Sequence, residues 1–430
     1  MTPRTAARVP TVPSRAAAVS RQLAETLDTP PPADSGGDRG PTSPRWHAQS
    51  LSKGAAGVAV LHGLRAQAGL TSADRVHDWL VAASREPVAA AGGAGLWYGA
   101  PALAFSLSHA APERYPRHQT RLHRAVEQLL ASRLEGARAR LHSGLPPSSS
   151  EFDLVRGATG VGAYLLHRAP QSPELRAVLR YLVRLTAPLP APESAEVALP
   201  GWWIRESLSG HRANGVEDGH ADLGMAHGVT GPLALLSHTM RAGVTVHGQA
   251  EAIDTIAAWL ERWRRTGPAG PWWPEHLTFG ELQTDVVDQA GPRRPSWCYG
   301  TPGIARALQL AGLALGDRVR QEQAETAFHR CLSDPAQRAQ LVDPAVCHGW
   351  AGVLATTWHA AADARFAPLA DHLPRLQDTL LHEATHGAAP LGPGLIEGRA
   401  GIAATLHCLT TGAGGWETCL LIAGEGPSHA

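Results

Sequence analysis

A pair of glycines recurs seven times along the chain, and this repeat constrains the fold more than any other feature of the sequence. Each copy has the form Gly-x-x-Gly and leads into a short run rich in Ala and Leu. The copies span residues 54–57, 99–102, 157–160, 228–231, 300–303, 349–352 and 398–401. Only the second copy lacks its second glycine, which is Ala102. The spacing of about 45 to about 70 residues is within or above the range of repeat proteins.

The runs after the glycines predict one set of helices, and the stretches between the repeats predict a second set. Runs such as 58–64, 304–310 and 402–409 carry few charges, and their Ala and Leu content favours helix over strand. Charged amphipathic stretches lie between repeats at 116–134, 174–185, 250–265, 318–332 and 364–384. An apolar helix that alternates with an amphipathic one is expected to form an inner and an outer layer.

Seven such hairpins predict an all-α fold, an α/α toroid in which about seven inner and seven outer helices form a double-layered barrel. Closure is favoured over an open solenoid because the terminal repeats are as apolar as the middle ones and have no polar caps. The glycines would permit tight turns and close backbone approach where the inner helices begin. The simpler explanation, glycines that merely break the helices of a bundle, does not account for a sevenfold recurrence.

Most of the chain is expected to form one domain, because a toroid grows by adding repeats. We expect a disordered tail at residues 1–14 and a single toroid domain at residues 15–430. Residues 15–27 have a helical pattern, and residues 29–45 read as a linker rich in Pro and Gly.

Composition excludes several classes of function. The 38 basic residues equal the 38 acidic ones, so nothing favours nucleic acid as a partner. Lys53 is the only lysine, which argues against a phosphate-binding lysine motif or a Schiff base. No apolar run approaches the length of a membrane span, so no stable membrane insertion is expected, and no signal peptide is recognisable. Together with an odd number of cysteines, five, these features predict a cytoplasmic protein with reduced thiols.

Two short motifs at equivalent points of successive repeats indicate a metal site. Cys298 in Trp-Cys-Tyr-Gly and Cys347 in Cys-His-Gly each stand before a repeat glycine, and His348 follows Cys347 directly. Two thiolates and an imidazole with no evident fourth ligand are typical of a catalytic zinc, and we expect one zinc ion per chain. A lone buried cysteine is more often a small hydrophobic residue. That interpretation is kept for Cys331, Cys408 and Cys419.

A further histidine falls at the register of the metal motifs. His227 has the same place in its repeat as His348 has in its own. Asp153 lies just before another repeat turn, where it would orient or charge this histidine, or equally cap a helix. Arg294 and Tyr299 flank the first cysteine of the metal motifs. The arginine would stabilise a developing oxyanion or simply be a loop charge.

These motifs, with Gly-Met-Ala-His-Gly at 224–228 and the Gly-x-x-Gly turns, resemble those of the lanthionine synthetase C-like family, the lanthipeptide cyclases. The resemblance covers the chain from about residue 15 onward, and Pro-Trp-Trp-Pro at 271–274 also resembles a segment of the family. It implies a toroid of seven inner and seven outer helices, with zinc near its centre held by the three residues of the metal motifs. His227 would be the acid/base residue, with Asp153, Arg294 and Tyr299 around it. A long insertion at 187–220 and the glycine lost at Ala102 depart from the family pattern.

The family's reaction adds a peptide cysteine thiol to dehydroalanine or dehydrobutyrine and so forms a (methyl)lanthionine thioether ring. The resemblance therefore implies a zinc-dependent lanthionine synthetase that acts on a dehydrated precursor peptide. Zinc would deprotonate the substrate thiol, Arg294 would face the enolate oxygen, and His227, tuned by Asp153, would protonate the α-carbon. No kinase or dehydratase domain is recognisable in the sequence, so a separate dehydratase is expected as a partner.

Two other functions stay open at the level of sequence. Zinc prenyltransferases also use α/α toroids and activate a cysteine thiol, but their zinc ligands come from separate segments, which the adjacent Cys-His pair disfavours. The other alternative is a non-catalytic toroid that binds a peptide, glutathione or a protein partner. His227 and Asp153 weigh against this second alternative without excluding it. The sequence does not reveal the precursor peptide, the ring pattern or the leader-binding surface, for which the insertion at 187–220 is only a guess.

Overall fold

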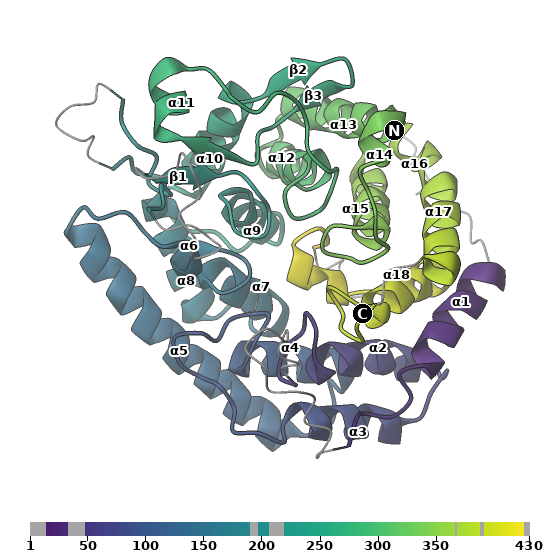
Figure 1. Ribbon diagram of the computed structural model, residues 1–430. Helices are drawn as coiled ribbons and strands as arrows, with labels where there is room; N and C mark the ends of the chain where they lie inside the picture. The colour runs from purple at the N-terminus through teal and green to yellow at the C-terminus, as the bar shows by residue number, and fades with distance from the viewer. Residues whose placement is uncertain are drawn as a thin grey trace, which may run out of the picture.

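Seven helices that begin within two residues of the first repeat glycines form the inner wall of a closed ring (Figure 1). They are α2 (Ala55–Gln67), α4 (Ala100–Ala110), α7 (Ala158–Arg168), α9 (Thr230–Arg241), α12 (Thr301–Leu315), α15 (Trp350–Asp363) and α18 (Arg399–Thr411). Most residues of these helices are buried, as their low charge predicts. Each inner helix contacts the next, and α18 contacts α2, so the ring closes.

A second layer of helices surrounds the inner wall. These are α1 (Ser14–Glu25), α3 (Ala73–Ala83), α5 (Pro116–His142), α8 (Pro173–Leu185), α10 (Gln249–Arg262), α13 (Arg318–Ser333) and α17 (Leu373–His386). Each packs on an inner helix through one apolar face; in α8 that face is Leu175, Val178, Leu179, Leu182 and Leu185. Seven inner and seven outer helices in the part of the chain that the structure describes confirm the predicted all-α toroid.

The computed structural model describes residues 14–32, 48–189, 197–205, 219–365, 368–387 and 391–424. The expected tail therefore lies outside the described residues except for Ser14, as does most of the linker at 29–45. Parts of the insertion at 187–220 also lie outside them, while its Trp202, Trp203 and Ile204 are buried in the core. None of the described helices has the length and apolar character needed to cross a membrane.

Four short strands and several short helices occur in addition to the two layers among the described residues. Strand β1 (His220–Asp222) pairs antiparallel with β4 (His276–Thr278), and β2 (Arg265–Gly267) pairs antiparallel with β3 (Gly270–Trp272). Short helices occur as α6 (Ser149–Phe152), α11 (Phe279–Thr284), α14 (Pro335–Arg338) and α16 (Pro368–Asp371), and a 3₁₀ helix, η1, spans Trp416–Leu420. The amphipathic stretch at 364–384 is divided between α16 and α17, because Pro374 lacks the N–H group that a continuous helix would need.

The second glycine of each pair lies against the carbonyl oxygen of the residue six positions earlier. A β-carbon built on Gly352 would stand 1.8 Å from the oxygen of Val346, and one on Gly303 would stand 2.0 Å from the oxygen of Trp297. The same relation holds for Gly57, Gly160, Gly231 and Gly401. Only glycine permits so close an approach, so the repeat spacing reflects a packing constraint at the start of each inner helix.

The C-terminal segment occupies the centre of the ring, where it is visible in yellow in Figure 1. Buried donors from the inner wall hold its carbonyl groups: Trp297 Nε1 donates to Leu420 at 2.9 Å, and Arg306 Nε donates to Ile422 at 2.9 Å. The ring of Trp297 in turn stacks on that of Trp97, with 5.7 Å between centroids. The described part of this segment therefore packs inside the ring and fills its core.

Replacing Gly352 with alanine tests the packing constraint. We expect Gly352→Ala to lower the free energy of unfolding by about 1–3 kcal/mol, because the new β-carbon overlaps a backbone oxygen that cannot move aside. The matched control is Gly136→Ala in α5, where a β-carbon meets nothing within 4 Å. That change should stabilise the protein by about 0.5–1 kcal/mol, since alanine favours helix. Urea unfolding measures both values, and equal effects of the two substitutions would contradict the constraint.

Candidate metal and catalytic site

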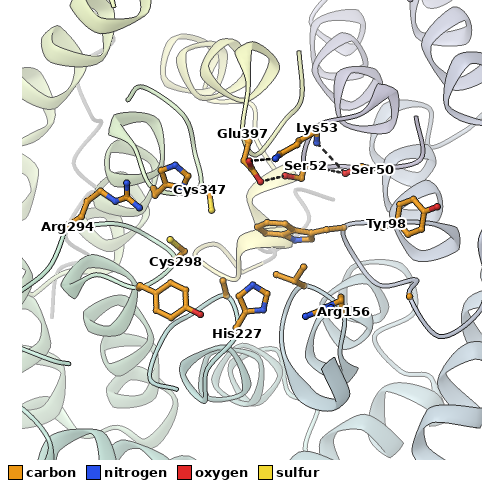
Figure 2. A pocket seen from close by; sticks show the side chains of 16 residues that line it. Ser50, Ser52, Lys53, Tyr98, Arg156, His227, Arg294, Cys298, Cys347 and Glu397 are labelled. Carbon is orange, nitrogen blue, oxygen red and sulfur yellow. Dashed lines mark hydrogen bonds and ion pairs between the residues drawn. The ribbon is translucent and has the colours of Figure 1, made fainter. Parts of the chain in front are cut away.

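A pocket of about 540 Å³ opens at the end of the ring where the inner helices begin (Figure 2). The residue directly before the first glycine of every repeat lines this pocket. These residues are Lys53, Tyr98, Arg156, His227, Tyr299, His348 and Glu397. The repeat therefore gathers one side chain from each of seven distant turns into a single space.

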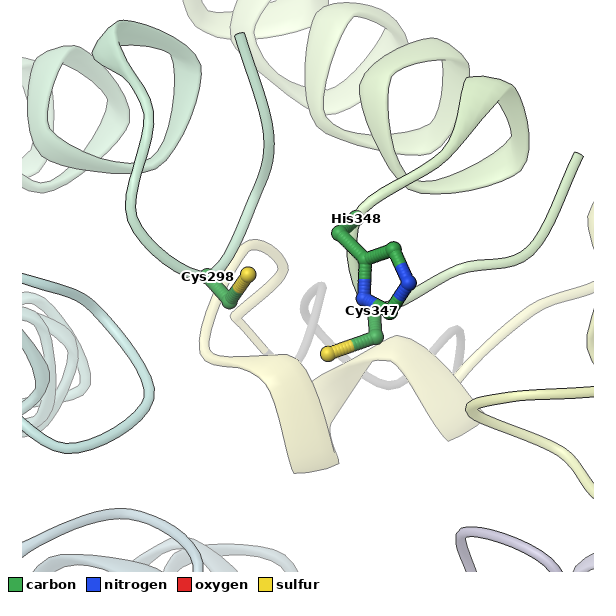
Figure 3. A group of neighbouring side chains, drawn as sticks. All are labelled: Cys298, Cys347 and His348. Carbon is green, nitrogen blue, oxygen red and sulfur yellow. The ribbon is translucent and has the colours of Figure 1, made fainter. Parts of the chain in front are cut away.

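Cys298, Cys347 and His348 converge on one side of the pocket (Figure 3). Two sulfurs and one imidazole nitrogen, one atom from each residue, all lie within 4.8 Å of one another. No other group of three or more Cys, His, Asp or Glu ligands gathers in this way among the residues that the structure describes. The adjacent Cys347 and His348 can share a target because they stand in the turn before α15 rather than within the helix.

The two thiols interact directly. The Cys347 thiol donates to the sulfur of Cys298, and this hydrogen bond lowers the pKa of Cys298, with smaller contributions from Ser296 and Arg294. The same contact, together with burial, raises the pKa of Cys347. Two neighbouring sulfurs, one of them with a lowered pKa, are suited to bind a soft or borderline cation such as zinc.

A carboxylate behind His348 completes the arrangement expected of a metal-binding histidine. Asp343 Oδ2 lies 3.4 Å from His348 Nε2, which leaves Nδ1 as the nitrogen available to an ion. The other carboxylate oxygen of Asp343 accepts the backbone N–H of Ala345 at 2.8 Å. Metal-bound histidines commonly donate their second nitrogen to such a carboxylate, so the residues present fit zinc.

His227 contacts a carboxylate, that of Asp153, just as His348 contacts Asp343. His227 Nδ1 lies 2.7 Å from Asp153 Oδ2, and Asp153 is fully buried. Its Oδ1 accepts the backbone N–H groups of Arg156 and Gly157, each at 2.7 Å. Burial lowers the pKa of His227, but the hydrogen bond and charge of Asp153 outweigh burial, so the pKa lies above its usual value. Asp153 thus both orients the histidine and anchors the turn before α7.

Tyr299 contacts a third carboxylate, that of the buried Asp222. The Tyr299 hydroxyl donates to Asp222 Oδ2 at 2.8 Å, and the backbone N–H of Gly224 donates to Oδ1 at 2.7 Å. Burial raises the pKa of Asp222 to about 6, against the effect of these hydrogen bonds. Burial and the neighbouring Asp222 raise the pKa of Tyr299 well above its usual value, so the phenol stays protonated.

Charged residues occupy the remaining wall. Arg294 lies beside the two cysteines, and Arg156 lies on the far side of His227 from them (Figure 2). Opposite them, Lys53 Nζ forms an ion pair with Glu397 Oε2 at 3.0 Å, and Ser52 donates to the other carboxylate oxygen of Glu397 at 2.9 Å.

The structure thus brings six of the seven residues singled out by sequence to the pocket wall and places the seventh, Asp153, directly behind His227. Cys331, Cys408 and Cys419 are buried at 3%, 1% and 0% exposure, which agrees with a packing role. Sequence reasoning missed Asp222 and Asp343. A signal for both existed, since each stands six residues before the first glycine of its repeat.

Comparisons of the sequence and of the fold with known proteins all match the same protein family. A sequence model of the family described as lanthionine synthetase C-like protein matches residues 45–421. The nisin biosynthesis protein NisC of Lactococcus lactis subsp. lactis is 26% identical over 267 residues, so the match spans 60% of this chain and 60% of that curated relative. A solved nisin cyclase has the same fold, with a TM-score of 0.75 at 20% identity over 94% of this chain and 96% of that one. The chain belongs to the lanthionine synthetase C-like family.

Proposed function

We propose that this protein is a zinc-dependent lanthipeptide cyclase that adds cysteine thiols of a dehydrated precursor peptide to dehydroalanine or dehydrobutyrine. The observation that carries the proposal is the convergence of Cys298, Cys347 and His348 in one pocket with His227. Three protein ligands leave a position open, and zinc bound there would supply deprotonation of the substrate thiol. Family membership and the curated relative, a nisin biosynthesis protein, support the substrate class.

Residues of the chain would then stabilise the negative charge that forms on the dehydroamino acid and supply the proton for its α-carbon. Addition of the substrate thiolate to the β-carbon places negative charge on the dehydroamino acid, and Arg294 beside the sulfurs would stabilise charge on that side of the pocket. His227 would give a proton to the α-carbon, in an orientation set by Asp153. Tyr299, whose hydroxyl donates its proton to Asp222, would offer its oxygen as a hydrogen-bond acceptor to the substrate from the wall between the cysteines and His227.

The proposal implies a cytoplasmic protein that works with a second enzyme. The peptide must already contain dehydroamino acids, so a separate dehydratase would supply it. The thiols must stay reduced, which suits the cytoplasm.

Zinc analysis tests the ligand set. We expect about one zinc per chain in the wild type and loss of most of it in Cys347→Ala, because the two remaining ligands, Cys298 and His348, bind zinc more weakly than three. Cys331→Ala is the matched control, since Cys331 is buried away from the pocket and should leave the zinc content unchanged. Full zinc occupancy in Cys347→Ala would remove this cysteine from the ligand set.

Cyclisation of a dehydrated, cysteine-containing peptide tests the reaction. Ring closure leaves the mass unchanged but protects the thiol from alkylation, so mass spectrometry after treatment with N-ethylmaleimide follows it. His227→Asn should keep zinc and lower kcat by about 10²–10⁴-fold, the usual contribution of a general acid. His247→Asn, an exposed histidine on the outer surface, should behave as wild type. A zinc-loaded wild type without activity would favour a toroid that only binds a peptide or thiol.

The partnership of Asp153 and His227 predicts a pKa shift that NMR titration can measure. Asp153→Asn should lower the pKa of His227, because the amide keeps the backbone contacts but removes the charge that favours imidazolium. The raised pKa also means that the ion pair stabilises the fold below the ordinary histidine value, about 6.5, and that this stabilisation is lost as pH rises through the folded pKa. An unchanged His227 pKa in Asp153→Asn would contradict the assigned role.

A further inference from the structure

The proposed reaction creates a negative charge at a definable place. As the substrate sulfur bonds to the β-carbon, the π-electron pair moves through the α-carbon onto the carbonyl oxygen. A proton then joins the α-carbon and the carbonyl re-forms; the proton lost by the thiol balances the one gained, so no co-reactant is needed. The carbonyl carbon is bonded to the α-carbon, which His227 would protonate. A group that stabilises the enolate oxygen must therefore lie beside His227 and away from the sulfurs.

Arg156 is the cation that occupies this place. It lines the pocket from the turn before α7, on the side of His227 opposite to Cys298 and Cys347 (Figure 2). Its charge is close enough to affect the pKa of His227. Among the residues that the structure describes, no carboxylate forms an ion pair with its guanidinium, and the side chain is exposed to the pocket.

One carboxylate fixes Arg156 and His227 relative to each other. Asp153 holds the His227 ring through Oδ2 and the backbone N–H of Arg156 through Oδ1, each at 2.7 Å. Since Asp153 is fully buried, neither contact competes with water. The two oxygens of Asp153 thus position the ring of His227 and the backbone of Arg156 relative to each other.

The turn that carries Arg156 is also held from outside the ring. Arg133 of α5 donates to the backbone carbonyls of Arg156 and Ala94. Gly95 packs so closely on the turn that an added β-carbon would stand 2.5 Å from the α-carbon of Arg156. A backbone fixed on both faces limits where the guanidinium can lie, and this reduces the reorganisation that stabilising an oxyanion would cost.

The other two cations of the pocket are less well placed for this oxygen. Lys53 is neutralised by its ion pair with Glu397. Arg294 stands beside the sulfurs, and His227 lies between it and Arg156 (Figure 2). Sequence reasoning assigned the enolate oxygen to Arg294, whereas the positions of the side chains favour Arg156.

We propose that Arg156 is a catalytic residue that binds the carbonyl oxygen of the dehydroalanine or dehydrobutyrine residue and stabilises the enolate formed there. This role rests on the proposed cyclase function. It adds a specific chemical requirement, a cation on the His227 side of the pocket that is distinct from the zinc ligands and from Arg294.

The test compares Arg156→Gln, Arg156→Lys and Arg294→Gln with wild type in the cyclisation assay. We expect Arg156→Gln to lower kcat by about 10²–10³-fold, the usual loss for one oxyanion donor, and Arg156→Lys to recover part of it. Zinc content, thermal stability and the Kd of the dehydrated peptide should stay within about threefold of wild type, because the interaction with the neutral carbonyl is weak and strengthens as the enolate charge develops. Arg124→Gln on the exposed face of α5 is the matched control and should leave kcat unchanged.

The possible outcomes separate the two proposals. A wild type that binds zinc but closes no ring overturns the cyclase function and this role together. An active wild type with Arg156→Gln at near-normal kcat overturns the role of Arg156 alone. A loss of kcat that is larger in Arg294→Gln, with zinc retained, returns the enolate oxygen to Arg294. A loss of zinc or thermal stability in both Arg156 variants shows a structural residue and also overturns the proposal.

Discussion

The architecture depends on one close contact, that of the second repeat glycine with the carbonyl oxygen six residues earlier. In six of the seven repeats this contact leaves no room for a β-carbon, and it fixes the residue at which the inner helix begins. The side chains just before the first glycine then stand at the same level around the ring. His227, Tyr299 and His348 share a pocket for this reason, although no two of them belong to the same turn.

The same geometry sets the electrostatics of the pocket. All seven inner helices direct their N-termini towards it, and the partial positive charge of those ends favours thiolates and other anionic groups. Behind the side chains of the pocket, three aspartates make the same pair of contacts. In each, Oδ1 accepts a backbone N–H of the turn, and Oδ2 contacts a side chain of the pocket. These are Asp153 with His227, Asp222 with Tyr299, and Asp343 with His348. The side chains to which we assign acid/base, hydrogen-bonding and metal-binding roles are therefore positioned by the same kind of carboxylate contact.

Much of this could be predicted from the sequence because repetition makes spatial equivalence visible. The glycine register predicts the ring, and it places Cys298, Cys347 and His227 at one end of it. The partners of these residues could not be predicted in the same way. Asp222 and Tyr299 belong to different repeats, so their hydrogen bond is not visible in the sequence. The position of Arg156 likewise depends on contacts with residues that are distant in sequence, such as Arg133 of α5. The strands and the divided helix at 364–384 depend on local proline and loop chemistry outside the repeat.

The C-terminal segment that fills the ring also limits how a ligand could reach the pocket. Contacts run without a break from Trp97 in the pocket wall to Trp297 and on to the backbone of Leu420. Packed side chains and backbone therefore close the pocket on this side. A peptide bound there, as the proposed function requires, would lie as a bend with both of its arms on the open side, so the lengths of those arms would be unrestricted. Under the same proposal, several rings along one peptide would be closed by repeated visits to the pocket, without either end being threaded through the protein.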